Sequence, residues 1–393
     1  MFKSNSKYKI AILLIVLIAS ISAFINIEYR SLFWDLSVYK RAVYDHSIGQ
    51  NPYRLDALFL FIYHPYILIL FFYIDKIADL NFVFASIFII SSYLFFKQIQ
   101  ENLYSEKIKT NFGNKLSIFW LFAPAICFGG AGIVALQSGN LTLYLHFAVI
   151  STFLYIKKNI NLKSIIYFLA CVVFVSLIKP YYLGYLILLI YLTNYKKAAL
   201  FSIISVLIFA AIWLSAGVYT PILYEKFLAA LTHQTLGQGD LGYAVFGLIR
   251  RFLGDAIALF IHVVVMVLAL GGAIFLTRRK ACELRSDEIM PLAIAFIIFL
   301  NPRMKEYDFP IAVLFVSFYM CKINTEIYLK SVFYSLLLAT IPVFTTVAVR
   351  FGYLKPAVYF TSIQFFQILG FSALSMCAIF SIRNLQKSTL PVS

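Results

Sequence analysis

The sequence predicts an all-α polytopic membrane protein: one domain over residues 1–393, built as a bundle of about 11–13 transmembrane helices. Three observations support this prediction. The chain is 62% hydrophobic and 13% charged, with a mean hydropathy of +0.88, which is more apolar surface than a soluble fold can bury. Apolar runs of span length recur along the whole chain. The basic residues behind the net charge of +16 lie in short segments between these runs, where they set topology rather than bind nucleic acid.

The first apolar run, AILLIVLIASISAFINI at residues 11–27, is longer than the apolar core of a signal peptide. It also lacks the small-residue cleavage site that follows such a core. We therefore expect it to be a retained membrane anchor.

The next segment, residues 28–57, is expected to be the first long noncytoplasmic loop and to contain a short helix in the membrane interface. Leu36, Tyr39 and Val43 fall on one helical face, while Lys40, Arg41, Tyr44 and Asp45 fall on the other. Gly49 and the Asn51–Pro52 pair end this helix. Asp35 would be its N-cap, a structural role that is compatible with service as a general base.

Counting basic residues assigns the loops to two sides. The basic set, expected in the cytoplasm, is Lys3, Lys7, Lys9, Lys97, Lys107, Lys109, Lys115, Lys157, Lys158, Lys163, Lys196, Lys197, Arg278, Arg279, Lys280, Arg285, Lys322, Lys330, Arg383 and Lys387. The opposite set is 28–57, 137–140, 179–182, the second long loop 218–254, 301–308 and 350–356.

Residues 57–135 do not fit this count. The two apolar runs 58–74 and 80–96 would cross twice and return the chain to the side that it had left. Either one of the segments is re-entrant, or the basic loop after Lys97 lies outside, and the sequence leaves both alternatives open.

Ionisable side chains recur where the predicted noncytoplasmic loops meet apolar runs. His64 could be an interfacial hydrogen-bonding group or a catalyst, and Lys179 could extend to the interface or pair with a phosphate. Arg250 lies near the end of the second long loop, and Arg303 and Lys305 lie in the turn NPRMKEYD. Together these cations suit an anionic lipid headgroup.

Several other kinds of site are not predicted. The match to GxGxxG at residues 237–242 follows no strand and is attributed to chance. The five cysteines are scattered without metal spacing, and no DxD pair is present. We therefore expect no metal ion and no cofactor.

These features together resemble the GT-C class of integral-membrane glycosyltransferases, and more narrowly glycosyltransferase family 87, the polyprenol-phosphate-mannose-dependent type. The resemblance covers about 280 residues, in order. It rests on Asp35, Tyr39–Ala42, Gly49, Pro52–Tyr53, Tyr63–His64–Pro65, Gln137–Ser138–Gly139–Asn140, Lys179–Pro180, the segment from His233–Gln234–Thr235 to Arg250, and Asn301–Pro302–Arg303. The chain departs from the family pattern at Tyr66, His233 and Tyr307–Asp308, which leaves the sugar and the acceptor open.

The resemblance implies an inverting, metal-independent transfer of a mannose-like hexose or a pentose. The donor would be a polyprenyl-phosphate-linked sugar, and the acceptor a lipid-linked or surface glycan. Asp35 would be the general base, and Lys179, Arg250, Arg303 and Lys305 would hold the donor phosphate. Substrate contacts would come from Tyr53, His64, Gln137, Asn140, His233, Gln234 and Asp308. The expected location is a bacterial inner membrane, with the active site on its noncytoplasmic side.

Two other functions use similar features. A flippase or transporter of a lipid-linked anion also needs basic sites and many spans, although paired halves with broken helices would be expected. A polymerase of lipid-linked glycans also uses outward-facing arginines and a large loop. Both remain alternatives to the transferase.

Overall fold

The computed structural model describes residues 34–57, 60–102, 139–236, 249–250, 252–261 and 263–264, with further positions at 290, 293–295, 297–298, 311, 315 and 352. Every regular element within these residues is helical. The chain forms two compact units. One comprises residues 27–104 and 134–241 and is called here the Asp35 unit; the other, residues 1–26, 105–133 and 242–393, is called the Arg250 unit.

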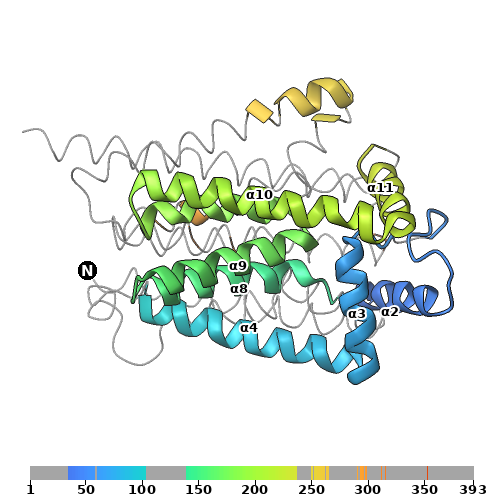
Figure 1. Ribbon diagram of the computed structural model, residues 1–393, viewed down its shortest axis with the longest axis horizontal. Helices are drawn as coiled ribbons and strands as arrows, with labels where there is room; N and C mark the ends of the chain where they lie inside the picture. Colours follow the sequence, from blue (N-terminus) through green and yellow to red (C-terminus); the bar gives the residue numbers. More distant parts are fainter. Residues whose placement is uncertain are drawn as a thin grey trace, which may run out of the picture. The chain divides into compact units, whose positions relative to one another are not determined.

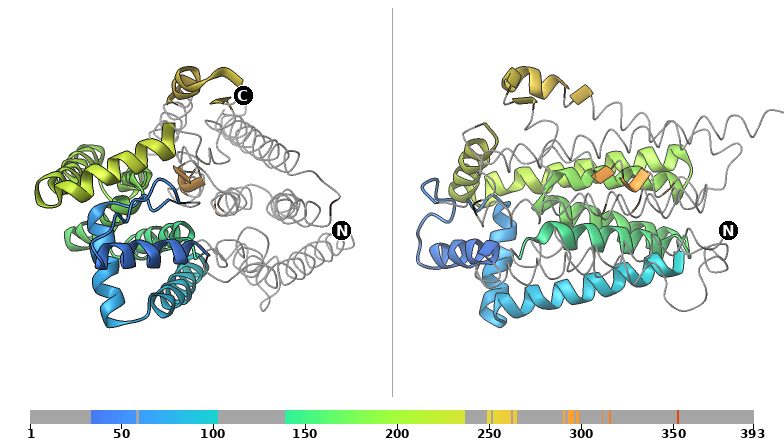
Figure 2. Two further views of the ribbon diagram at one scale, coloured as in Figure 1. Left: turned by 90° about the vertical axis from the view of Figure 1, so that its right-hand side faces the viewer. Right: turned by 180° about the vertical axis from the view of Figure 1, so that it is seen from behind.

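The Asp35 unit has four α-helices running side by side along its length and others gathered at one end (Figures 1 and 2). The lengthwise helices are α4 (Leu80–Asn102), α8 (Leu141–Ile156), α9 (Leu162–Ile178) and α10 (Tyr195–Tyr219). The 3-10 helix η1 (Pro180–Tyr191) packs against α9 and α10. At one end lie α2 (Trp34–Ser47), α3 (Pro65–Ile77) and α11 (Pro221–Leu236).

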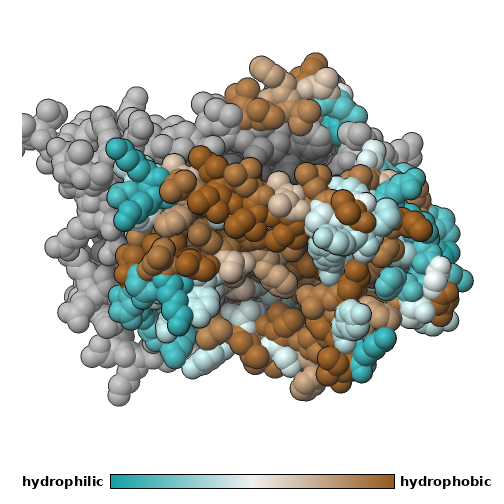
Figure 3. Space-filling model, viewed as in Figure 1, coloured by the Kyte–Doolittle hydropathy of each residue, from teal (hydrophilic) through white to brown (hydrophobic). Residues whose placement is uncertain are grey.

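Two of the described helices, Leu80–Ile99 within α4 and the whole of α10, are long and apolar enough to cross a membrane. On α10 large apolar side chains are exposed at consecutive positions, Val206, Leu207 and Ile208, which point in different directions around the helix. A helix that is apolar on every side must be covered by lipid or by other helices. Figure 3 shows the matching surface of this unit, an apolar band between two hydrophilic ends.

The first apolar run after the loop forms the short helix α3. Its 13 residues rise about 20 Å, less than the roughly 30 Å of a bilayer's hydrocarbon core. In Figure 1, α3 runs across the ends of the lengthwise helices, whereas α4 runs along them. This arrangement favours the first of the two alternatives for residues 57–97, in which only one of the two runs crosses.

In the Asp35 unit, the described residues of the basic set of loops lie at one end, and the described residues of the opposite set lie at the other end. At the far end, Lys158, just beyond α8, pairs with Glu101 in the last turn of α4. Lys97 lies one turn earlier on α4, and Lys196 and Lys197 begin α10. The described parts of 28–57, 137–140, 179–182 and 218–236 meet at the other end, called here the Asp35 end.

Asparagine side chains start three of the lengthwise helices. Oδ1 of Asn140 accepts from Thr142 N–H (3.0 Å), Asn161 from Ser164 N–H (2.8 Å) and Asn194 from Lys197 N–H (3.0 Å). Each contact satisfies a backbone donor that the helix itself cannot pair. α9 ends at Ile178, and the residue after it, Lys179, has the extended backbone (φ −145°, ψ 111°) that the following Pro180 favours.

Helix α2 confirms that residues 28–57 contain a short helix, with two corrections. It ends at Ser47, and Gly49 turns the chain with φ 73°, as predicted. It begins at Trp34, so Asp35 lies in the first turn rather than at the cap. Asp45, expected on the polar face, is only 3% exposed, since the chain turns back after Gly49 and Gln50 N–H donates to the Asp45 carbonyl (2.8 Å).

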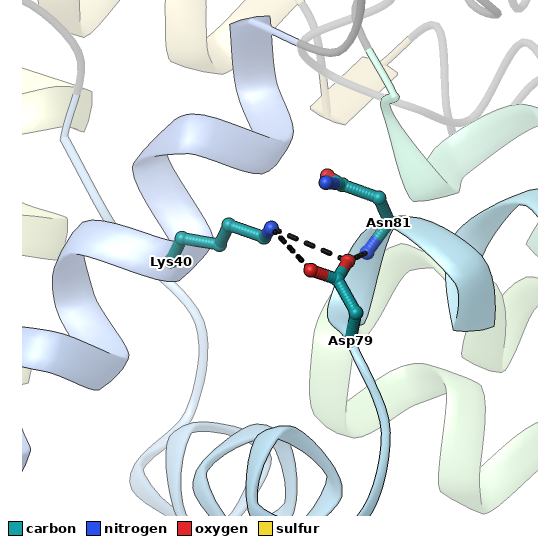
Figure 4. Close-up of polar contacts among 3 residues, drawn as sticks. All are labelled: Lys40, Asp79 and Asn81. Carbon is teal, nitrogen blue, oxygen red and sulfur yellow. Dashed lines mark hydrogen bonds and ion pairs between the residues drawn. The ribbon is translucent and has the colours of Figure 1, made fainter.

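The buried face of α2 carries Tyr39, whose ring stacks on Phe84 of α4 and whose hydroxyl lies 2.8 Å from the Tyr63 hydroxyl. On the surface, the Lys40 ammonium lies 3.3 Å from both carboxylate oxygens of Asp79 (Figure 4). Asp79 also accepts from Asn81 N–H (2.6 Å) and so caps α4, and this backbone bond, with Lys40, lowers the Asp79 pKa. These contacts attach α2, and Asp35 with it, to the start of α4.

Candidate functional site

The structure brings Asp35 into contact with the start of α8, 105 residues away in the sequence. Nδ2 of Asn140 donates to Oδ2 of Asp35 at 2.8 Å, and the pair is partly buried. Asp35 also lies in the first turn of α2, where the helix dipole favours a negative charge. The position suits an ionised carboxylate.

Lys179 joins the same turn of α8 from the end of α9. Its ammonium donates to Oγ1 of Thr142, the second residue after Asn140. One turn of α8 therefore carries both contacts, with Asp35 on Asn140 and Lys179 on Thr142. Of the twelve predicted site residues, Asp35, Asn140 and Lys179 form this connected group.

A row of buried polar and aromatic side chains continues from Lys179 along α8, and sequence reasoning missed it. The Tyr182 hydroxyl donates to the Thr142 carbonyl (2.7 Å), and one turn deeper His146 Nδ1 lies 2.7 Å from the Tyr185 hydroxyl. The His146 and Tyr182 rings lie 4.8 Å apart. A histidine inside an apolar run is itself a signal of function, and Thr142 and His146 are spaced to share a helix face.

His64 is fully buried, and the protein itself engages both of its ring nitrogens. Nδ1 accepts from Tyr66 N–H (3.3 Å) and caps α3, which makes Nε2 the donor to the Trp213 carbonyl of α10 (3.2 Å). Burial lowers the pKa of His64, and the bond to the Trp213 carbonyl partly opposes this. These contacts favour the hydrogen-bonding role of His64 over the catalytic one.

Tyr53 lies in the loop between α2 and α3 and is 1% exposed. Its hydroxyl donates to the Tyr63 carbonyl (2.9 Å), and its ring packs against Phe61 and Phe227. Burial raises its pKa well above the ordinary value. Tyr53 thus anchors the loop to α11.

The remaining predicted residues are placed elsewhere or lie outside the described residues. His233 is exposed and Gln234 half-buried near the end of α11. Arg250 belongs to the Arg250 unit, where it pairs with Asp255. Gln137, Arg303, Lys305 and Asp308 fall outside the described residues. Within the described ranges, no group of three or more His, Cys, Asp or Glu residues is placed to hold a metal ion.

The chain matches no protein-family model and no curated protein sequence. The chemistry of the site is therefore inferred from its own residues. The half-buried Asp35 carboxylate can accept a proton and the Lys179 ammonium can hold an anion, and both groups are hydrogen-bonded to residues of one turn of α8.

Proposed function

We propose that the chain is a polytopic glycosyltransferase that moves a sugar from a polyprenyl-phosphate donor to a glycan or glycolipid acceptor. The observation that carries the proposal is the joining of Asp35 and Lys179 through Asn140 and Thr142. It connects the predicted base and one of the predicted phosphate-binding cations, which lie 144 positions apart in the chain.

In the proposed reaction, Lys179 holds the donor phosphate and Asp35 accepts the proton of the attacking acceptor hydroxyl. The acceptor oxygen bonds to the anomeric carbon as the bond from that carbon to the phosphate oxygen breaks, which inverts the configuration. The phosphate leaves as an anion that Lys179 stabilises, so the step needs no metal. Arg250, Arg303 and Lys305 remain proposed phosphate-binding residues, as the resemblance implies.

Tyr53 and His64 support the site rather than contact the substrate in this proposal, because their polar atoms are engaged within the protein. Gln137, His233, Gln234 and Asp308 remain proposed substrate contacts. The sugar and the acceptor are named here by class alone.

The proposed placement puts the Asp35 end at the noncytoplasmic surface of a bacterial inner membrane. Three features support this orientation of the unit: the apolar band between hydrophilic ends, the lysines at the far end, and the short α3 lying across the lengthwise helices. The polyprenyl chain would then lie along the band, with its phosphate at headgroup depth beside Lys179.

The test compares membranes containing the wild type, Asp35→Asn, Lys179→Ala and Asp56→Asn, supplied with radiolabelled polyprenyl-phosphate mannose, glucose or arabinose. Asp35→Asn keeps an oxygen to accept from Asn140 but loses the base, so transfer should fall about 100-fold or more while donor binding persists. Lys179→Ala should raise the KM for donor and also lower kcat, because Lys179 both holds the phosphate and stabilises it as it leaves.

Asp56→Asn is the matched control, since it removes an exposed carboxylate paired with Arg54 at the same end. Its rate should equal that of the wild type. Equal rates for wild type and Asp35→Asn would remove Asp35 from the mechanism. Movement of intact donor across the membrane without transfer would identify a flippase instead.

A further inference from the structure

Asn140, predicted as a substrate contact, makes two contacts that give its side chain a different task. Its Oδ1 accepts from Thr142 N–H (3.0 Å), and its Nδ2 donates to Asp35 Oδ2 (2.8 Å). A backbone N–H can only donate, so the amide oxygen must face Thr142 and the amide nitrogen must face Asp35. The reverse orientation would set two donors against each other and the carbonyl oxygen against the carboxylate.

Asp35 consequently receives a hydrogen-bond donor whose direction the backbone of α8 fixes. A donor facing Oδ2 favours the ionised carboxylate, which is the form that a general base needs. The same contact restricts the rotation of the carboxylate, so its other oxygen takes a defined direction.

Thr142 orients the Lys179 ammonium as Asn140 orients the Asp35 carboxylate. Its N–H bonds to Asn140, its carbonyl accepts from the Tyr182 hydroxyl (2.7 Å), and its Oγ1 accepts from the Lys179 ammonium. Pro180 fixes the extended backbone at Lys179, and Tyr185 attaches the following segment to His146. The lysine is therefore oriented at both its backbone and its ammonium group.

We infer that Asn140 and Thr142 are positioning residues, which set the direction of the Asp35 carboxylate and of the Lys179 ammonium from a single turn of α8. This inference rests on the proposed function. Asp35 lies on α2 and Lys179 follows α9. Their side chains keep fixed directions because both are hydrogen-bonded to the same turn of α8. In this inference Asn140 and Thr142 act on the reaction through Asp35 and Lys179.

Two substitutions separate positioning by Asn140 from its cap. Asn140→Ser and Asn140→Asp both keep an oxygen that can accept from Thr142 N–H, and both residues are good N-caps, so both proteins should fold. Asn140→Asp has no donor to offer Asp35, and Asn140→Ser replaces the amide N–H with a hydroxyl one bond nearer the backbone, which withdraws the donor from Asp35. Asn140→Ser should lower kcat by about tenfold or more, with the KM for donor within about twofold.

Asn140→Asp adds a negative charge beside Asp35, so the acid limb of its rate profile should move to higher pH. The other charged and titratable groups on the elements at this end stay the same in every variant: Lys40, Arg41, Asp45 and His46 on α2, Asp75 and Lys76 on α3, Asp79 before α4, and Lys179 after α9. Asn194→Ser and Asn194→Asp are matched controls, because Asn194 caps α10 at the far end through Lys197 N–H (3.0 Å). They should leave the rate and its pH profile unchanged.

Thr142→Val keeps the volume and removes the oxygen that accepts from Lys179. The KM for donor should rise about tenfold with a smaller change in kcat, and Thr142→Ser should restore it. If Thr142→Val leaves KM unchanged, or if Asn140→Ser retains the wild-type kcat, the inference is overturned.

A measurement without substrate separates this inference from the proposed function. A water-soluble carbodiimide labels protonated carboxyl groups, and mass spectrometry locates the label on Asp35 as the pH is varied. In Asn140→Asp the labelling midpoint should move to higher pH, while Asn194→Asp should match the wild type. An unmoved midpoint overturns the inference whether or not sugar is transferred. A moved midpoint in a protein that transfers no sugar supports the orientation of Asp35 by Asn140 and rejects the proposed function.

Discussion

Protonation of His64 should destabilise the Asp35 unit. His64 is fully buried, and a proton added to Nδ1 would face the Tyr66 N–H, donor against donor. The contact that caps α3 would be lost, and an unpaired charge would be placed among Trp213, Tyr224 and Phe227. The lowered pKa of His64 is the thermodynamic expression of this cost.

The direction of the pH effect follows from that pKa. At low pH the unfolded chain binds a proton at this histidine more readily than the folded protein does, so stability falls as the pH drops below about 6.5, the ordinary value for histidine. The loss levels off below the pKa of the folded protein. Above about pH 7.5 the contribution of His64 is fully present.

The size of the substitution effect can be worked out from the contacts. His64→Phe keeps the ring packing but removes the α3 cap, worth about 1 kcal/mol, and the bond to the Trp213 carbonyl, worth about 1 kcal/mol more. The sum of about 2 kcal/mol corresponds to a fall in Tm of roughly 4–8 °C for a unit of this size. His64→Ala also leaves a cavity and should cost about 3–5 kcal/mol.

The assay is thermal unfolding in detergent, followed by tryptophan fluorescence between pH 5 and 8, since Trp213 contacts the His64 ring. The difference in Tm between wild type and His64→Gln should shrink as the pH falls. His233→Gln, which changes an exposed histidine, is the control and should show no such trend. A difference that is constant or grows toward acid pH would refute the assignment of His64 as a buried neutral cap.

Two further results are expected. Phe147→Ala should lower the free energy of unfolding by about 3 kcal/mol and Phe147→Leu by clearly less, because the Phe147 ring is fully buried and stacks on Phe95 of α4 at a centroid distance of 4.2 Å. Thermal unfolding of both variants measures these losses, and equal losses would contradict the prediction. Lys40→Met should lower Tm slightly at low ionic strength and not at about 0.5 M salt, because the pair with Asp79 is exposed. Asp79→Ala should cost more at either ionic strength, because it also removes the α4 cap; a loss no larger than that of Lys40→Met would count against the cap.

Much of the unit's organisation could be read from local signals. The helix within residues 28–57, its end before Gly49 and the gathering of the described basic loops at the far end depend on neighbours in sequence, and the structure agrees with each of them. The same local reasoning misplaced Asp45, because burial depends on the chain folding back over the helix end. It also missed His146, whose partner Tyr185 lies 39 positions away.

The sequence alone predicted helices, and among them stretches long and apolar enough to cross a membrane, because a backbone that leaves water must pair its hydrogen bonds internally, as a helix does. The described residues agree, since every regular element is helical and two helices have the length and composition of a span. The sequence also singled out Asp35, Asn140 and Lys179. Only the tertiary structure decided that these three meet on the first turn of α8, that α3 is too short to cross, and that His64 is enclosed within the protein. The physical reason is that these contacts form between helix ends, and packing between segments far apart in the sequence decides which helix ends lie together.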